Sequence, residues 1–191
     1  MSGVTESNKI VARSAAAAFG GKPEVRRYYD DDESHWLDVL SCSGRPSRGF
    51  TTYSTLGLHT AKNELDGVNV AVEFAGVASS ECLDFASLLA TAGFFVQKDG
   101  WLAAPGVVFP SLLEEYDLST TLSHVLWTTP FPWEKLNSVA TSASVHVHWL
   151  LAIPISESER SFLLEYGFEE LEAAFAQHEI DYFNLRRQPV V

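Results

Sequence analysis

The feature that most constrains the fold is an apolar run that ends directly at a helix start signal. Residues 145–155 are rich in β-branched and aromatic side chains, which is typical of a central β-strand, and Pro154 lies near the end of the run. Residues 156–159, Ser-Glu-Ser-Glu, match the S-x-x-E capping box, in which the serine caps the third amide of a helix and the glutamate bonds back to the serine N–H. The pattern therefore predicts a buried strand followed at once by a helix.

The other predicted elements repeat this mixture of strands and helices. Turn residues and β-rich segments predict strands over residues 25–29, 36–42, 50–57, 68–74 and 123–128. Helix formers predict helices over residues 5–19, 81–91 and 157–177, the second ended by Gly93 and the third interrupted near Gly167. Residues 94–143 are otherwise expected to be irregular, because prolines punctuate short apolar segments there.

The segment 68–74 shows the clearest period of two. Apolar and other residues alternate along it in the order Val68, Asn69, Val70, Ala71, Val72, Glu73 and Phe74. Successive side chains of a strand point to opposite faces, so this pattern predicts one buried face and one wet or lightly covered face. The side chains that we expect to be buried are Val70, Val72, Leu150 and Phe162.

Composition indicates one globular domain over residues 1–191, since 46% of the residues are apolar and 20% are charged. Thirteen basic and 25 acidic residues give a net charge of −12, which argues against a nucleic-acid binder and fits a basic protein partner. No apolar run approaches the roughly 20 residues of a membrane helix, and residues 1–14 lack the apolar core of a signal peptide. We therefore expect a soluble cytoplasmic protein that does not associate with a membrane.

The sequence contains no motif for catalysis. It has no G-x-S-x-G nucleophile motif and no glycine-rich phosphate loop. Its two cysteines, Cys42 and Cys82, make neither a disulfide framework nor a zinc site, and we expect them to be free buried thiols. The sequence therefore predicts a protein that is not an enzyme, with no catalytic residues, no metal and no cofactor.

Two alternatives to this prediction stay open. His146 and His148 alternate on one predicted strand, so both side chains would share a face and could ligate one metal ion. Glu64, Asp66 and Glu73 lie close in the sequence and could supply paired carboxylates for acid–base chemistry.

Acidic residues gather in two places that are candidates for binding a partner. One is the predicted turn Asp30-Asp31-Asp32-Glu33, and the other, around the Gly167 break, comprises Glu165, Glu169, Glu170 and Glu172. The alternative is that these acids form an ordinary solvated surface and serve solubility alone. Aromatic residues anchor many interfaces, and an exposed Tyr28, Tyr29 or Trp133 beside either group would favour binding.

Several motifs, in order along the chain, resemble those of Suppressor-of-fused domains. Residues 36–40 and 50–58 resemble the aromatic-rich strand pair of that family, which ends in T-x-G-[LM]. Further matches are Asp99-Gly100-Trp101 with Pro105-Gly106, the WLLAIPI of residues 149–155, Ser156-x-x-Glu159 with Phe162 and Gly167, and then Leu171 with Ile180-Asp181. The similarity spans about residues 25–187. One departure is the absence of the family's R-x-E-L sequence, where Asn69-Val70-Ala71-Val72 stands instead.

This resemblance implies an α+β fold with a mixed, largely antiparallel β-sheet packed with helices in an α/β sandwich. Stand-alone bacterial members of the family resemble immunity proteins, which bind and neutralise a toxin, whereas the animal member sequesters a transcription factor. The single domain expected here favours the first role. The resemblance thus implies a protein-binding module that neutralises a cognate toxin, and the net charge of −12 favours a basic toxin such as a nuclease. An intracellular regulator that sequesters a host protein is the alternative. The oligomeric state is left open.

Overall fold

The computed structural model describes residues 5–136 and 138–191. The expectation about the N-terminal segment falls partly on residues 1–4, which lie outside the described residues. The helices are α1 (Glu6–Phe19), α2 (Phe85–Asp99), α3 (Glu157–Tyr166) and α4 (Phe168–Gln177), with short 3₁₀ turns at Leu58–Thr60 and Glu114–Tyr116. The strands are β1 (Pro23–Tyr29), β2 (Trp36–Ser43), β3 (Phe50–Leu56), β4 (Glu64–Leu65), β5 (Val68–Asn69), β6 (Ala71–Ser79), β7 (Val108–Phe109), β8 (His124–Thr128), β9 (Ser138–Ala140) and β10 (His146–Ile155).

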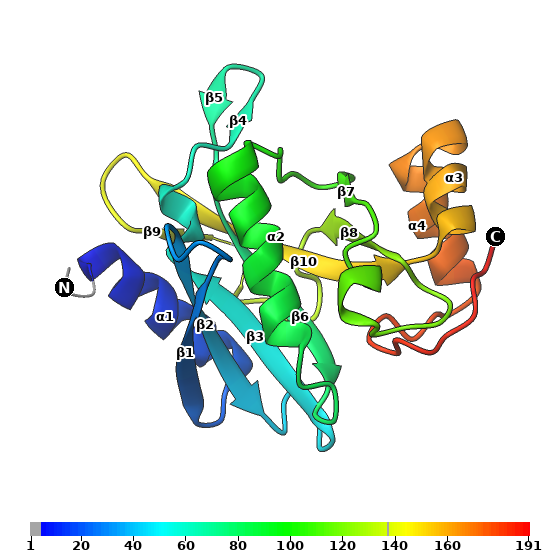
Figure 1. The fold of residues 1–191 in the computed structure, drawn as a ribbon, viewed down its shortest axis with the longest axis horizontal. Coiled ribbons are helices and arrows are strands. Elements are labelled where there is room, and N and C mark those ends of the chain that lie inside the picture. Colours follow the sequence, from blue (N-terminus) through cyan, green and yellow to red (C-terminus); the bar gives the residue numbers. More distant parts are fainter. Residues whose placement is uncertain (1–4, 137) are drawn as a thin grey trace.

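One mixed sheet forms the centre of the molecule (Figure 1). Its strand order is β1-β2-β3-β6-β10-β8-β7, with β9 paired to β10, and β4 and β5 form a separate hairpin. Strands β6 and β10 run parallel, with Ala71 opposite Val147, and the other strand pairs of the sheet are antiparallel. The predicted α+β class with a mixed, largely antiparallel sheet is therefore confirmed.

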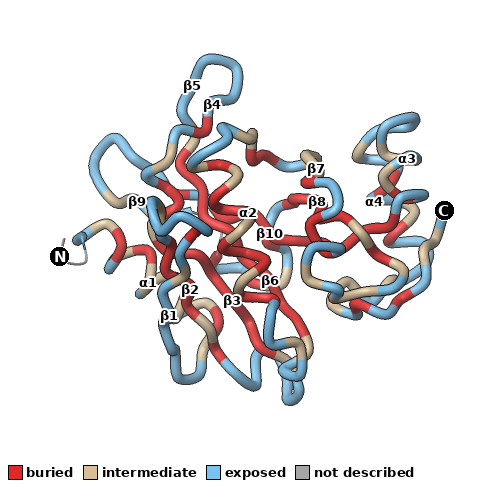
Figure 2. The backbone as a smooth tube through the Cα atoms, viewed as in Figure 1, coloured by how far each residue is buried: buried red, intermediate tan, exposed pale blue. Residues whose placement is uncertain are grey.

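Helices cover both faces of this sheet and bury its central strands (Figure 2). Helix α2 packs on one face, where Leu88 and Leu89 join a cluster with Phe74, Trp127 and Leu150 of the sheet. On the other face, α1 and α4 pack with Trp149 and the remaining inward residues of β10 in a second cluster. Strands β6 and β10 thus have buried side chains on both faces.

The prediction of a single half-buried strand over residues 68–74 is wrong in two respects. Val68 and Asn69 belong to the small hairpin instead, and Val68 is 64% exposed. From Ala71 onward both faces are covered, because the face that holds Ala71 and Ala75 packs against the cluster that includes α1. Val72 and Leu150 are buried as expected, whereas Val70 and Phe162 are only half-buried.

Helix α2 begins later and runs further than predicted. Gly93 does not end it but lies inside it, because the helix passes very close to the sheet there. A Cβ atom on Gly93 would lie 2.5 Å from Cδ2 of Leu37 in β2. The helix ends at Gly100, which adopts a left-handed conformation (φ 69°) and donates its N–H to the carbonyl of Phe95. The expected irregular segment 94–143 therefore opens with helix, and it also contains β7.

The capping box at the start of α3 is confirmed atom by atom. The Glu159 N–H donates to Oγ of Ser156 at 3.1 Å, and the Ser156 N–H donates to Oε2 of Glu159 at 2.9 Å. Glu159 is fully buried, and its carboxylate also accepts hydrogen bonds from Nη1 and Nη2 of Arg187, at 2.6 and 2.9 Å. The same glutamate therefore starts α3 and holds the C-terminal segment against it. Within the described residues, no helix is both long and apolar enough to cross a membrane.

Candidate partner-binding surface

The acidic turn of residues 30–33 joins β1 to β2, and its first residue is committed to the fold. Asp30 is only 8% exposed, and its carboxylate accepts from Nζ of Lys98 at 2.7 Å and from the His35 N–H at 2.9 Å. Burial opposes ionisation of this carboxyl, but the hydrogen bonds from Lys98 and His35 outweigh it and lower the pKa of Asp30. Asp30 thus ties the turn to α2 and offers no free charge to a partner.

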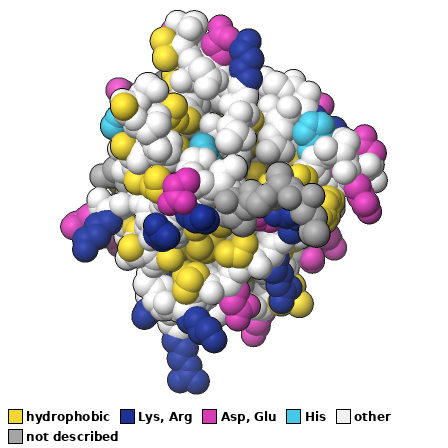
Figure 3. Space-filling model, turned by 90° about the vertical axis from the view of Figure 1, so that its left-hand side faces the viewer, with side chains coloured by type: hydrophobic (Ala, Val, Ile, Leu, Met, Phe, Trp, Pro, Cys, Tyr) yellow, Lys and Arg dark blue, Asp and Glu magenta, His cyan; other side chains and the backbone are white. Residues whose placement is uncertain are grey.

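The other three acids of this turn, Asp31, Asp32 and Glu33, are exposed. Lys98 also approaches Asp32, at 3.4 Å, and offsets part of the charge. Figure 3 shows the side of the molecule that lies to the left in Figure 1, where α1 and β1 lie. Acidic side chains stand there at separate places among basic and apolar ones. The turn therefore contributes local negative charge from Asp31, Asp32 and Glu33, part of which Lys98 offsets.

Of the three aromatics proposed as anchors, Tyr29 is 54% exposed beside the turn. Tyr28 is half-buried, and Trp133 is buried with its ring centroid 4.9 Å from that of Phe19. The sequence did not single out Trp36, which is 37% exposed and lies under the guanidinium of Arg27 at 3.9 Å. This pair is fixed, because Arg27 also makes two hydrogen bonds to Asp38, at 2.8 and 3.0 Å.

The second acidic group is fully accessible. Glu165, Glu169, Glu170 and Glu172 are all exposed, and they flank the turn at Gly167 that joins α3 to α4. Leu164 and Tyr166, which are 69% and 56% exposed, accompany them. Arg160 is the one lysine or arginine between residues 157 and 181, and it forms an ion pair with Glu157 at 3.0 Å. We call this group the α3–α4 surface; its role in binding stays a prediction.

An apolar groove that sequence reasoning missed lies at the base of the β4–β5 hairpin, which projects from the molecule (Figure 1). A cavity of about 330 Å³ opens there, lined mainly by apolar side chains that include Leu65, Val70 and Pro130. The Asp66-Gly67 turn signal for the hairpin was visible in the sequence. The partner strand β4 was too short to show a pattern, so Val68 was assigned to the buried strand instead.

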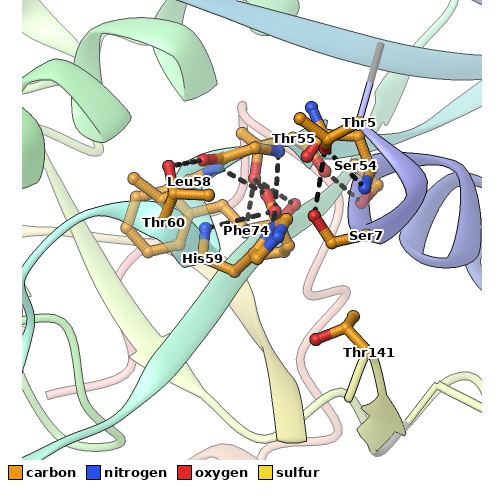
Figure 4. Close-up of polar contacts among 12 residues, drawn as sticks. Thr5, Ser7, Ser54, Thr55, Leu58, His59, Thr60, Phe74 and Thr141 are labelled. Carbon is orange, nitrogen blue, oxygen red and sulfur yellow. Dashed lines mark hydrogen bonds and ion pairs between the residues drawn. The ribbon is translucent and has the colours of Figure 1, made fainter. Parts of the chain in front are cut away.

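Glu64, Asp66 and Glu73, the candidates for paired carboxylates, lie in different environments. Glu64 is exposed and ion-paired to Lys62 at 2.8 Å, and Asp66 is exposed in the hairpin turn. Glu73 is fully buried, and two of its hydrogen-bond partners, Thr55 and His59, are labelled in Figure 4. It accepts hydrogen bonds from the backbone N–H groups of residues 57–59 and from the Thr55 hydroxyl and His59 Nδ1, the last two at 2.6 Å. This arrangement starts the 3₁₀ turn after β3 and has no access to a substrate.

The histidine pair lies at the exposed start of β10. Both His146 and His148 are exposed, and His148 lines the apolar groove. Among residues 5–136 and 138–191, no three His, Cys, Asp or Glu side chains gather in a metal-binding arrangement. Cys42 is buried and Cys82 half-buried; both are free thiols, and burial raises the pKa of each.

The fold and these surfaces define a helix-covered mixed sheet of the Suppressor-of-fused type. The family model for Suppressor of fused protein (SUFU) matches residues 33–188, and the chain belongs to this family. The chain is also 36% identical to the Immunity protein YqcF of Bacillus subtilis (strain 168), over 99% of this chain and 100% of that protein.

Solved structures agree with this assignment at the level of the fold. A putative SUFU homologue from Neisseria gonorrhoeae FA 1090 has a TM-score of 0.75 at 18% identity, covering 97% of each chain. A chain of the Sufu–Fu complex gives a TM-score of 0.67 at 13% identity, covering 96% of this chain and 92% of that one. Drosophila Suppressor of Fused gives 0.66 at 14% identity, and this chain spans 51% of its length.

Proposed function

We propose that this chain is an immunity protein that acts in the cytoplasm by binding a cognate toxin and blocking it, without catalysis. The observation that carries the proposal is the 36% identity, over essentially the whole length of both chains, to an immunity protein of Bacillus subtilis. The finding of a family member in the Sufu–Fu complex supports protein binding as the mode of action.

The charge of the molecule supports a basic toxin as the partner. Enzymes that attack nucleic acids carry basic surfaces because their substrates are polyanions. A chain of net charge −12 attracts such a surface, and the exposed acids of the α3–α4 surface present this charge with little opposing charge nearby. We therefore propose a nuclease as the toxin.

Co-expression tests the proposal. The toxin is taken as the product of the gene directly upstream of this one, expressed from an inducible promoter. We expect growth to stop when the toxin is expressed alone and to recover when this chain is expressed with it. A neighbouring protein that is harmless, or that remains toxic with this chain present, contradicts the proposal. The harmless outcome favours instead a regulator that sequesters a host protein.

The stoichiometry of neutralisation separates binding from catalysis. A binding protein titrates the toxin, so residual nuclease activity should fall in proportion to added protein and reach zero near equal molar amounts. An enzyme that inactivates the toxin would do so at far lower ratios, given time. The matched control is a heat-unfolded sample of the same protein, which should leave toxin activity unchanged.

A further inference from the structure

A small pocket lies beside α4, where the structure brings together four segments distant in the sequence. Its floor is made of Leu126 of β8, Ile153 of β10 and Phe175 of α4, which are at most 2% exposed. Its walls include Phe131 and Tyr182, whose rings meet edge to face with centroids 4.8 Å apart. We call this cavity of about 150 Å³ the Glu172 pocket.

Phe131 is the most exposed hydrophobic side chain of the pocket. It is 54% exposed, although a phenylalanine gains about 1.5–3 kcal/mol from full burial. It follows Pro130, which is buried and fixes the direction of the backbone at the rim. Aromatic residues are enriched among the residues that contribute most to binding at protein interfaces, and Phe131 stands at the rim of a cavity where a partner could cover it.

Glu172 is the one charged residue that lines this pocket, where the Thr128 hydroxyl is the other polar group beside the aromatic and aliphatic side chains. Glu172 of α4 is exposed, and its carboxylate accepts a long hydrogen bond, 3.4 Å, from the Thr128 hydroxyl. No basic side chain is among the lining residues. Arg187 lies 5.3 Å from the ring centroid of Phe175, but both of its terminal nitrogens donate to Glu159. Among the described residues, therefore, Glu172 has no cation paired with it.

The pKa of Tyr182, another lining residue, reflects burial and also the negative charge of Glu172. Burial raises the pKa of Tyr182, and the negative charge of Glu172 raises it further, while Arg187 acts in the opposite direction. The phenol therefore stays protonated and neutral at physiological pH, and the rings around Glu172 are all uncharged. The pocket combines apolar walls, aromatic faces and one carboxylate.

This combination selects a cation on an apolar stem. An anion would be repelled by Glu172, and a purely apolar group would desolvate the carboxylate without pairing it. An arginine side chain packs its methylene stem on aromatic rings, stacks its guanidinium on their faces and bonds a carboxylate with two parallel N–H groups. A cavity of about 150 Å³ holds one group of roughly the size of benzene, which suits the end of one such side chain.

We propose that the Glu172 pocket receives an arginine side chain of the partner protein, and that the α3–α4 surface around it binds the surrounding basic segment. The identity of that partner as a toxin rests on the proposed function; the ligand chemistry of the pocket does not. Glu165 of α3 and Glu169 and Glu170 of α4 are also exposed, so these two helices carry further negative charge.

The probe for the pocket is N-acetyl-L-arginine methylamide, titrated into the full chain and followed by NMR shifts of residues 128, 131, 172 and 182. The citrulline analogue has nearly the same shape without the charge, so it serves as the matched probe. We expect saturable shifts with the arginine probe and at least about tenfold weaker binding of the citrulline probe, because a hydrogen bond to a charged group contributes about 1.5–3 kcal/mol.

Variants locate the binding. Glu172→Gln and Phe131→Ala should each weaken arginine binding about tenfold or more. Both side chains are exposed, so the fold should persist, as checked by circular dichroism. Glu179→Gln is the matched control, because it removes an exposed glutamate that lies outside both the pocket lining and the α3–α4 surface. The inference fails if no shift saturates, if citrulline binds as well as arginine, or if Glu172→Gln behaves like Glu179→Gln.

The two proposals fail separately. If the wild-type chain protects cells from the toxin and the Phe131→Ala/Glu172→Gln double variant protects equally, the pocket is wrong and the immunity role stands. If the arginine probe binds as expected but the wild-type chain gives no protection, the immunity role is wrong and the pocket serves another basic partner.

Discussion

The environment of Glu73 is hard to predict from the sequence, because the residue occupies a polar position in a strand of alternating apolar and polar residues. In the structure it is fully buried, and the backbone N–H groups after β3, Thr55 and His59 all direct hydrogen bonds to its carboxylate. The sequence lacks the family's R-x-E-L motif, and the alternation of apolar and polar residues over 68–74 gives no sign of these contacts. They depend on the turn at residues 57–60, which is a feature of tertiary structure.

We predict that Glu73→Gln lowers the free energy of unfolding by about 3–5 kcal/mol, because it replaces a charged acceptor by an amide that cannot satisfy every donor. Urea unfolding followed by tryptophan fluorescence measures the change. Glu64→Gln is the matched control, since Glu64 is exposed and its ion pair with Lys62 should contribute no more than about 1 kcal/mol. Equal effects of the two substitutions would contradict the structural role assigned to Glu73.

The lowered pKa of Asp30 predicts that the stability of the fold depends on pH. Its pKa is lower in the folded protein than the ordinary value of 3.8, so its contribution to stability is complete above that value. The contribution is then lost as the pH falls through the folded-state pKa. We expect Asp30→Asn to lower the melting temperature at pH 7 and to flatten its decline below pH 4. Asp31→Asn, at the exposed neighbouring position, should leave both quantities close to those of the wild type.

At the scale of elements, the contact between α2 and β6 depends on a glycine. A Cβ atom on Gly76 would lie 2.5 Å from Cε1 of Phe85, the first residue of α2. Phe85 is 1% exposed and has no room to move aside. We expect Gly76→Ala to destabilise the fold by about 1–3 kcal/mol in urea unfolding, as overpacking of a core does.

The Gly76→Ala effect should couple to the ring that it displaces. In a Phe85→Leu background the added methyl group meets a smaller side chain, so the alanine should cost less there than in the wild type. A double-mutant cycle measures this difference. Additive effects of the two substitutions would show that the helix does not rest on Gly76 as described.

The elements that the sequence predicted well are those with a strong local signal. Residues 145–155 and the capping box at Ser156 correspond closely to β10 and the start of α3, and the break at Gly167 separates α3 from α4 as expected. Helix α2 was predicted badly because Gly93 acts through a neighbouring strand and not through its own backbone. Local patterns do not contain that information.

The candidate binding sites also combine features that the sequence shows with features that only the tertiary fold creates. The run of acids at residues 30–33 was easy to find, but its charge depends on Lys98, which only the tertiary fold brings to the turn. The Glu172 pocket takes its lining from β8, β10, α4 and the segment near Tyr182, so its single sequence signal was Glu172. A site built from four segments has no spacing rule along the chain.

At the scale of the whole molecule, we expect residues 5–191 to unfold in one transition. The two hydrophobic clusters lie on opposite faces of the same strands, so neither can lose its packing without exposing the other. Trp127 belongs to one cluster and Trp149 to the other. Variants that keep only Trp127 or only Trp149, with the other four tryptophans replaced by phenylalanine, let each cluster be followed separately by fluorescence. Two different midpoints in urea would contradict the single-domain organisation.

Net charge predicts the rate of association with a basic toxin. Steering by the acids should make the association rate constant fall with salt, because screening shortens the reach of exposed charges. We expect a Glu165→Lys/Glu169→Lys/Glu170→Lys variant to associate about tenfold more slowly at low salt and to lose most of this dependence. The comparison variant is Asp31→Lys/Asp32→Lys/Glu33→Lys, which should have a smaller effect. If neither variant changes association, the acids serve solubility.

The parallel pairing of β6 with β10 has a consequence for the time course of folding. Strands β1, β2 and β3 pair in succession along the chain, so that part of the sheet needs only short loops to close. The middle of the sheet is different, because Ala71 must find Val147 after the whole intervening segment has been made. We expect closure of this long loop to set the folding rate. During synthesis, β6 can extend the β1-β2-β3 meander as soon as it is made, and its other edge then stays unpaired until β10 is complete.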